Sequence, residues 1–276
     1  MRVDFTKMHG LGNDFIVLHA APGTELPAAQ WRTLADRHRG IGFDQALVIE
    51  PPRREGTAAF YRIFNADGHE VEQCGNGARC IAELLRLEGR AAGDALVMES
   101  PGGIVRARLP GAGMVAIDMG VPDFSPAAVA FDAAGEPGPH YRLDVDGTTV
   151  TFAIVSMGNP HAVLPVASVA TAPVATLGPR LESHARFLRR VNVGFREIVD
   201  PGHIRLRVFE RGVGETQACG TGACAAVAAG RRDGLLRPEV RVSLPGGDLT
   251  IRWDGGTSPL WLEGPAEVSF RGQVEL

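Results

Sequence analysis

The chain has 276 residues and a formal net charge of −4, with 45% hydrophobic and 22% charged residues. This composition is typical of a globular chain with one large or two ordinary domains, and it gives no reason to expect nucleic acid as a partner. The first ten residues lack the apolar stretch of a signal peptide, and no apolar run is long enough to span a membrane. We therefore expect a cytoplasmic protein without a membrane partner, whose four cysteines are reactive or buried rather than bridged.

Lysine occurs once, at Lys7, and arginine supplies the remaining positive charge. A Walker-type phosphate loop is therefore excluded, and no HExxH metal helix is present. A pyridoxal enzyme needs a Schiff-base lysine, and Lys7 lies in a strand-like stretch near the N-terminus. The spacings from Cys74 to Cys80 and from Cys219 to Cys224 are not those of a structural zinc site. The sequence thus predicts neither a cofactor nor a metal.

In the first half of the chain, strand-like and helical patterns follow one another. Residues 59–64, AFYRIF, alternate apolar and polar side chains with the period of a strand. A polar, glycine-rich turn around Cys74 then opens a helix predicted over 78–87, and Gly89 is placed to end it. Residues 95–99, ALVME, are followed by Pro-Gly-Gly and predict a hairpin.

The second half begins with a Pro- and Gly-rich tract at 120–139, which we interpret as a surface segment. The strand pattern returns at 204–209, IRLRVF, and Cys219 again precedes a glycine turn and a helix. That helix, GACAAVAAG at 222–230, is small and apolar on every side, which indicates burial. Residues 240–253 predict a second hairpin.

The two cysteine turns belong to an internal repeat, because Cys219 lies 145 residues after Cys74. At that offset, YRIFNADGHEVEQCGNGA (61–78) aligns without a gap with LRVFERGVGETQACGTGA (206–223). Upstream there are two looser echoes, HGLGNDF (9–15) with VSMGNPH (155–161) and GIGFDQ (40–45) with NVGFRE (192–197). Three features in one order favour two related domains over chance or a common turn solution.

The repeat and the element pattern together predict the fold class. We expect an α+β fold with two pseudo-symmetric domains, each a curved mixed β-sheet or barrel wrapped around one central helix. The first domain is predicted over 1–119 and the second over 120–264, with one cysteine turn in each.

Each of Cys74 and Cys219 precedes a glycine turn that opens a helix. Unpaired backbone N–H groups and the helix dipole favour negative charge there, so we expect lowered thiol pKa values and an anion site on the same turn. Racemising a carbon needs a base on one face and an acid on the other, and a thiolate and a thiol supply both in either direction. We therefore interpret the two thiols as a coupled acid/base pair.

Simpler interpretations of these cysteines remain. For Cys74 and Cys219 these are buried structural thiols or a disulfide, and their polar, glycine-flanked setting argues against ordinary burial. Cys80 and Cys224 lie inside apolar helical stretches and are predicted to be buried structural side chains.

Several polar residues accompany the cysteine turns. The asparagines are predicted to lie in turns, where asparagine is common for structural reasons, although an amide also binds amine and carboxylate groups; they are Asn13, Asn65, Asn76, Asn159 and Asn192. His161 is read first as a satisfied polar residue. Glu210-Arg211 replaces Asn65-Ala66 at the offset of the repeat, so one domain alone supplies a charged pair suited to an ammonium and a carboxylate.

At these residues the sequence resembles the diaminopimelate epimerase family. The motifs KMHGLGNDF, GIGFDQ, RIFNADG, CGNGARC, SMGNPH and ERGVGETQACGTGACAA match its pattern over nearly the whole chain, whereas CGxG alone is shared with proline racemases and phenazine-type isomerases. The resemblance implies a cofactor-independent isomerase that interconverts LL- and meso-2,6-diaminopimelate in lysine and peptidoglycan-precursor synthesis. It also implies an active site between the two domains and a return of 265–276 to the first.

The resemblance assigns roles to residues at the matching positions. It makes Cys74 and Cys219 the acid/base residues, assisted by His161 and Glu210. Substrate binding falls to Asn13, Gln45, Asn65, Gly75, Asn76, Asn159, Asn192, Glu210, Arg211, Gly220 and Thr221. The family also suggests a homodimer with a tyrosine at the interface, and Phe270 stands at that position here, without the hydroxyl.

Other classes of protein share parts of this pattern. A proline racemase uses two thiols but has no use for a distal arginine and so many amides. A phenazine-type isomerase lacks the paired thiols. A non-catalytic amino-acid-binding protein with a Cys74–Cys219 disulfide is the alternative outside enzymes.

Overall fold

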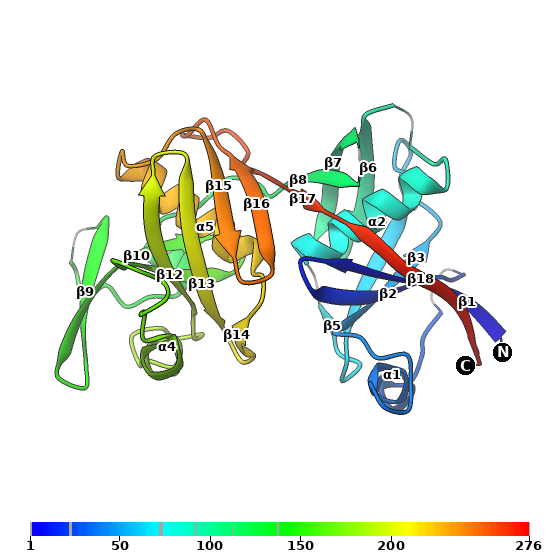
Figure 1. Ribbon diagram of the computed structural model, residues 1–276, viewed down its shortest axis with the longest axis horizontal. Helices are drawn as coiled ribbons and strands as arrows, with labels where there is room; N and C mark the ends of the chain where they lie inside the picture. Colours follow the sequence, from blue (N-terminus) through cyan, green and yellow to red (C-terminus); the bar gives the residue numbers. More distant parts are fainter. Residues whose placement is uncertain are drawn as a thin grey trace. The chain divides into compact units, whose positions relative to one another are not determined.

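The chain folds into two compact units, which are drawn in Figure 1. The computed structural model describes residues 2–21, 24–71, 74–91, 93–111, 113–136 and 138–275. Unit 1 comprises Met1–Asp118 with Glu263–Leu276, and unit 2 comprises Met119–Leu262. The C-terminal residues therefore belong to the same unit as the N-terminal ones.

Unit 1 contains a mixed β-sheet, two helices and the C-terminal strand. Its elements are β1 (Arg2–Gly10), β2 (Asn13–His19), α1 (Ala28–Ala35), β3 (Gln45–Glu50), β4 (Phe60–Asn65), β5 (Glu70–Val71), α2 (Gly75–Leu87), β6 (Ala95–Ser100), β7 (Gly103–Gly111), β8 (Met114–Asp118) and β18 (Glu267–Glu275). Strands β2 and β3 are parallel, as are β4 and β6, and the other neighbours are antiparallel. Strand β18 pairs along β1, from Arg2 opposite Glu275 to His9 opposite Glu267.

Helix α2 forms the centre of unit 1. Its residues from Asn76 to Leu85 are all buried, and it packs against β1, β2, β3, β7 and β8, which surround it in Figure 1. It begins at Gly75, three residues before the predicted start, and Gly89 follows its C-terminus with φ +71°, as predicted for the residue that ends it. A helix buried on all sides needs the sheet to curve around it, which places its N-terminus at the edge of the core.

Unit 2 repeats this arrangement with different side chains. Its elements are α3 (Pro126–Val129), β9 (His140–Val145), β10 (Thr148–Ser156), β11 (Pro160–Pro165), α4 (Val174–Glu182), β12 (Asn192–Asp200), β13 (His203–Glu210), β14 (Gly214–Thr216), α5 (Gly220–Arg232), β15 (Glu239–Leu244) and β16 (Gly247–Arg252). Strand β17 (Trp261–Pro265) crosses the boundary at Leu262. Helix α5 is buried from Gly222 to Gly230 and packs against β10, β11, β12, β13 and β16.

The two units share one order of strands and pairings. The antiparallel pair β1–β2, the parallel pairs β2–β3 and β4–β6, and the hairpin β6–β7 recur as β10–β11, β11–β12, β13–β15 and β15–β16. Even the side-chain contacts repeat at the offset of 145: Arg62 binds Glu70 through two hydrogen bonds, and Arg207 binds Glu215 in the same way. The predicted α+β class with a central helix in each half is confirmed.

One of the two looser sequence matches aligns residues that are not structural counterparts. Gln45 lies opposite Asn65, and because Val193 lies opposite Phe209, the next position of β12 brings Asn192 opposite Glu210. Asn192 is therefore the counterpart of Gln45, whereas the match of GIGFDQ to NVGFRE pairs Gln45 with Glu197. The reason is that the Gly-Phe pair precedes β3 in unit 1 but lies inside β12 in unit 2.

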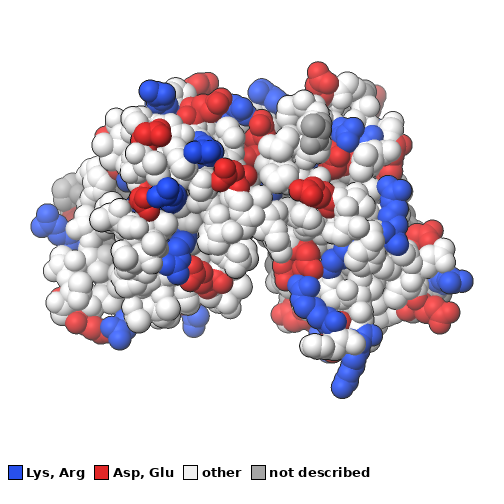
Figure 2. All heavy atoms as spheres, viewed as in Figure 1, with Lys and Arg blue, Asp and Glu red and all other residues white. Residues whose placement is uncertain are grey.

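The surface carries charges of both signs. On the face in Figure 2, acidic and basic side chains are intermixed. Within the described residues, we find no helix that is both long and apolar enough to cross a membrane.

Candidate active site

The first cysteine turn lies at the N-terminus of α2 in unit 1. Cys74 is the residue before the helix, and its Sγ accepts a hydrogen bond from the backbone N–H of Gly77 at 3.4 Å. The thiol also donates to Oδ1 of Asn13 at 3.9 Å. Because a helix N-terminus favours negative charge, the sulfur lies where a thiolate is stabilised, with an amide oxygen facing its proton.

Amide side chains surround this thiol. Nδ2 of Asn76 donates to Oδ1 of Asn13 at 3.2 Å, and Nδ2 of Asn13 donates to Oδ2 of Asp44 at 2.9 Å. On the neighbouring strands, Nε2 of Gln45 donates to Oδ1 of Asn65 at 2.9 Å. Within the described part of the chain, Oδ1 of Asn76 and Oε1 of Gln45 are buried and accept no hydrogen bond, so both remain available to a donor group of a ligand.

The second cysteine turn lies at the N-terminus of α5 in unit 2. The thiol of Cys219 donates to Oε2 of Glu210 at 3.1 Å and contacts Oγ1 of Thr221 at 3.7 Å. Thr216 holds the other carboxylate oxygen of Glu210, with an Oγ1–Oε1 distance of 2.5 Å. The carboxylate is therefore fixed between two donors and directed at the sulfur.

Two expectations for Cys219 are wrong. The side chain is buried rather than open, with 4% relative exposure. Its pKa is raised rather than lowered, because burial disfavours the thiolate and the charge and hydrogen bond of Glu210 add to that effect, while the N–H of Gly222 and the hydroxyl of Thr221 only partly oppose it. A carboxylate within hydrogen-bond distance thus outweighs the helix N-terminus, and Cys219 is held as a thiol.

His161 lies beneath the second turn as a buried, neutral ring. Burial, with the charge of Arg211 in addition, lowers its pKa to about 3. Its Nε2 lies 2.9 Å from Oδ1 of Asn159, and Nδ2 of Asn159 donates to Oγ1 of Thr221 at 3.2 Å. A chain of hydrogen bonds therefore connects the imidazole to the hydroxyl that touches the sulfur of Cys219.

The turn after β13 carries Arg211. Its backbone N–H donates to Oδ1 of Asn192 at 2.9 Å, and Asn192 in turn donates to the carbonyl of Pro160 at 2.9 Å. Oε1 of the buried Glu182 accepts the N–H of Gly212 at 3.0 Å. The turn is thereby fixed at two consecutive backbone positions, while the Arg211 residue itself is exposed.

The sequence matches one family over most of its length. The family model described as diaminopimelate epimerase matches residues 5–125 and 153–268, which include both cysteine turns. The chain belongs to the diaminopimelate epimerase family. Two curated relatives with that name come from Nitrosomonas eutropha, 52% identical over 280 residues, and Pseudomonas aeruginosa, 49% identical over 277 residues; each alignment covers 100% of both chains. The family consists of isomerases, and the predicted enzyme class is confirmed.

Solved structures with low sequence identity share the fold of the epimerase family. A phenazine biosynthesis protein of the PhzF family from Bacillus anthracis matches with a TM-score of 0.71 at 15% identity and covers 100% of both chains. A hydroxyproline epimerase from Agrobacterium vitis matches with a TM-score of 0.67 at 16% identity, over 99% of this chain and 92% of that one. These likenesses support the fold and carry no statement about the substrate.

The positions of the polar residues in this family member differ in part from the prediction. Only Asn159 lies in a bend; Asn13 and Asn192 begin strands, Asn65 ends one and Asn76 lies in the first turn of α2. Strand ends at the rim of a curved sheet present their side chains beside the helix N-terminus, so turn propensity was the wrong reason for their placement. Gly75 and Gly220 are the first residues of α2 and α5, as the glycine turns predicted.

Three residues near the site were missed at the level of sequence. Asp44 binds Asn13, and Thr216 binds Glu210. Glu182 binds the turn that carries Arg211. For Thr216 a signal existed, because Val71 stands at the matching position of the first half, next to the change from Asn65 to Glu210. Within the described residues, none of the four cysteines is in a disulfide, and no group of three His, Cys, Asp or Glu side chains is arranged to hold a metal.

Proposed function

We propose that the chain is a cofactor-independent epimerase that interconverts LL- and meso-2,6-diaminopimelate, and so acts in lysine and peptidoglycan-precursor synthesis. The observation that carries this proposal is the pair of thiols at the N-termini of the central helices, inside a full-length match to relatives named for that activity. The alignment with the relative from Nitrosomonas eutropha covers 100% of both chains.

The proposed reaction moves one proton on each face of the α-carbon. Cys74, with the N–H of Gly77 on its sulfur, takes the α-proton as a thiolate: the C–H bond breaks, its electrons remain on the substrate, and an S–H bond forms, whose proton then faces the amide oxygen of Asn13. Cys219, held as a thiol by burial and Glu210, delivers its proton to the opposite face and becomes the thiolate. The reverse reaction exchanges the two roles, so the enzyme returns to its first state by turnover in the other direction or by proton exchange with solvent.

The negative charge that develops on the substrate needs a stabiliser. The first-turn residues of both helices, Gly75 and Asn76 in α2 and Gly220 and Thr221 in α5, offer backbone N–H groups that suit the carboxylate beside the reacting carbon. We propose that the remaining amide side chains, together with Glu210 and Arg211, bind the amine and the distal end of the substrate. These amides are Asn13, Gln45, Asn65, Asn159 and Asn192. His161 acts through Asn159 and Thr221 as a neutral positioning residue.

The test must also distinguish the proposed function from two alternative functions. A proline racemase-like activity would use the same thiols without Arg211. An amino-acid-binding protein with a Cys74–Cys219 disulfide would not exchange protons at all.

We also propose a cytoplasmic homodimer, as in the family. Phe270 on β18 is 50% exposed and Val268 on the same strand is 36% exposed, so apolar surface suited to a partner subunit is present. Phe270 packs edge-on against Phe5, with 5.9 Å between ring centroids, which fixes the ring without a hydroxyl.

Incubation with LL-diaminopimelate in deuterated water under reducing conditions tests the proposed function. Deuterium at the α-carbon together with the meso isomer is the expected result, and proline should not be racemised. Cys74→Ser and Cys219→Ser should each abolish net epimerisation, whereas Cys80→Ala, a matched change of a buried thiol in α2, should not. Wild-type turnover in either serine variant, or racemisation of proline instead, would contradict the proposal.

A further inference from the structure

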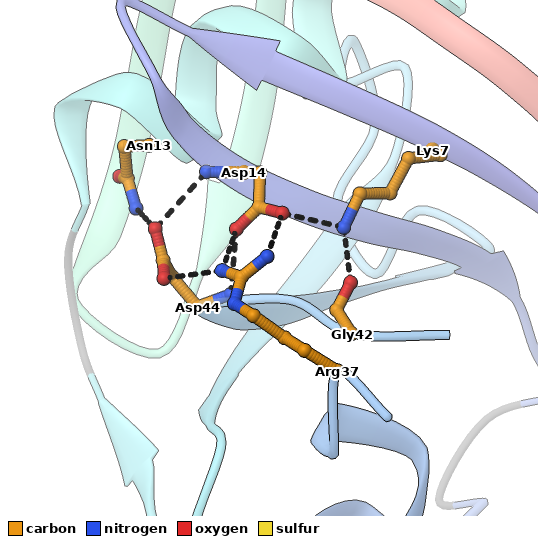
Figure 3. A network of polar contacts seen from close by, with 6 residues as sticks. All are labelled: Lys7, Asn13, Asp14, Arg37, Gly42 and Asp44. Carbon is orange, nitrogen blue, oxygen red and sulfur yellow. Dashed lines mark hydrogen bonds and ion pairs between the residues drawn. The ribbon is translucent and has the colours of Figure 1, made fainter. Parts of the chain in front are cut away.

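A charged cluster of four side chains lies behind the first cysteine turn in unit 1 (Figure 3). Nζ of Lys7, the single lysine of the chain, donates to Oδ2 of Asp14 at 2.6 Å and to the carbonyl of Gly42. The guanidinium of Arg37 binds both oxygens of Asp14, at 2.9 and 2.7 Å, and Oδ1 of Asp44 at 2.9 Å. The cluster thus ties β1 and β2 to the segment that enters β3.

The carboxylate of Asp14 in this cluster is held in the ionised form. The side chains of Lys7 and Asp14 are only 9% and 17% exposed. Burial on its own would raise the pKa of Asp14, but the hydrogen bonds from Arg37 and Lys7 outweigh burial and lower it to about 2. Asp14 and Asp44 are also connected through their backbones: each donates its N–H to a carboxylate oxygen of the other, at 3.0 and 3.2 Å.

The cluster determines which end of the Asn13 side chain faces the thiol. The Asp44 carboxylate accepts from Arg37, from the backbone N–H of Asp14 and from the NH₂ end of the Asn13 amide. The oxygen end is then directed at the other neighbours, where it accepts from Cys74 and from Asn76. A reversed amide would place its NH₂ group beside the sulfur and would favour a thiolate over a thiol.

Unit 2 orients the matching asparagine differently. Gly12 and Gly158 both have positive φ, +83° and +87°, and each precedes an asparagine, Asn13 in one unit and Asn159 in the other. Asn159 is held by His161 and Thr221, and its NH₂ end is directed toward the cysteine turn. The residue after Asn159 is a proline where Asn13 is followed by Asp14, so the carboxylate of the cluster has no counterpart at this position.

We propose that the cluster formed by Lys7, Asp14, Arg37 and Asp44 positions the Asn13 amide so that its oxygen faces Cys74, and that Asp44 is a positioning residue for the proton transfers of that thiol. This inference rests on the proposed function for its kinetic consequences. Its structural part concerns the reactivity of one thiol and does not depend on the substrate.

Two substitutions of Asp44 separate orientation from charge. Asp44→Asn removes the charge but keeps an oxygen that accepts from Asn13, whereas Asp44→Ala removes both. The pH dependence of Cys74 alkylation by iodoacetamide, followed by peptide mass spectrometry, reads out the thiol directly. Among the described residues, Tyr61 and Cys80 interact electrostatically with Cys74, and both stay neutral over the working range: burial raises the pKa of Tyr61 well above it and that of Cys80 to about 12.

In Asp44→Ala we expect the alkylation midpoint of Cys74 to fall by about half a pH unit or more, because the released amide is free to donate to the sulfur. Epimerisation should lose at least about tenfold in kcat, since misplacement of a catalytic group is costly. The kcat of Asp44→Asn should remain within about threefold of the wild-type value. Equal midpoint shifts in the two variants would show a charge effect alone, and an unchanged midpoint in a folded Asp44→Ala protein would show that Asp44 does not orient Asn13; either result overturns the inference.

A second pair of variants guards against a general loss of stability. Arg37 and Arg53 are 55% and 51% exposed at the side chain, and each binds a carboxylate of unit 1. Arg37→Gln should shift the Cys74 midpoint in the same direction as Asp44→Ala, and Arg53→Gln should leave it unchanged; equal behaviour of the two would overturn the inference. If wild-type protein does not epimerise diaminopimelate while the midpoint shift in Asp44→Ala persists, the proposed function fails and the positioning role stands.

Discussion

The thiol of Cys219 donates a hydrogen bond to Oε2 of Glu210 at 3.1 Å, and the position of Glu210 is occupied by Asn65 in the first repeat. Cys74 donates instead to the neutral amide oxygen of Asn13. Two cysteines related by a repeat therefore have unequal surroundings. Burial, and after it the charge of Glu210, favours the protonated form of Cys219, which suits the role of proton donor proposed for this residue.

Replacing Glu210 with glutamine should change Cys219 selectively. Burial, and after it the carboxylate, raises the pKa of this thiol, so Glu210→Gln should move its alkylation to lower pH, and kcat should fall about 100-fold because the proposed proton donor loses the carboxylate that favours its protonated form. Alkylation mapping and steady-state kinetics measure both effects. Glu197→Gln, which changes a carboxylate bound by Arg205, serves as the control. An unchanged alkylation profile at Cys219 would show that the contact does not control this thiol.

The paired helix glycines give a test with an internal control. A methyl group at Gly222 would lie 3.0 Å from a methyl of Val208 and 3.2 Å from Sγ of Cys219, whereas at Gly77 it would lie 3.0 Å from a methyl of Leu47 and 3.6 Å from Cβ of Cys74. Gly222→Ala should therefore lower kcat by about tenfold or more, and Gly77→Ala by less than about threefold. Urea unfolding should show losses of about 1–3 kcal/mol at most in either variant. Equal kinetic losses would count against the crowding of the sulfur.

His161 should make the folded state sensitive to acid. Its folded pKa of about 3 lies below the unfolded value of about 6.5, so the unfolded chain binds the extra proton first as pH falls. The contribution of neutral His161 to the free energy of unfolding is complete above pH 6.5. Below that pH it is lost, by about 1.4 kcal/mol per pH unit. His161→Gln should flatten the stability curve between about pH 6 and 4, and His38→Gln, an exposed site, should not. Parallel curves for wild type and His161→Gln would refute this role.

Local patterns were sufficient to predict the repeated parts of the fold. The strand period around Arg62 and Arg207, the glycine turns and the apolar helix after Cys219 each depend on neighbouring residues, and the structure has the corresponding elements. Burial of Cys80 and Cys224 followed from the same helices and is confirmed. Such features are visible in sequence because they are determined by periodicity within about a dozen residues.

Contacts between segments that are distant in the sequence could not be predicted from local residue patterns. The high pKa of Cys219 depends on a carboxylate nine residues away that reaches it only through the β13–β14 hairpin. The partners of Asn13 and the register that equates Asn192 with Gln45 depend on strand pairing. The positions of the two thiols could therefore be predicted from the helix N-termini. Their protonation states could be derived only from the tertiary structure.

Arg211 should determine selection for a long, doubly charged substrate. Its backbone is fixed by Asn192 and its guanidinium donates to the carbonyl of Arg189 at 3.2 Å on an exposed turn, where a planar fork suits a distal carboxylate. Arg211→Ala should lower kcat/KM for diaminopimelate about 100-fold or more, since leaving that carboxylate unpaired costs roughly 2–5 kcal/mol. Slow deuterium exchange at saturating substrate should persist, because both thiols and both helix N-termini remain. Arg205→Ala, on strand β13 before this turn, should behave as wild type. Complete loss of exchange in Arg211→Ala would place this arginine at the reacting end of the substrate and reverse the proposed orientation.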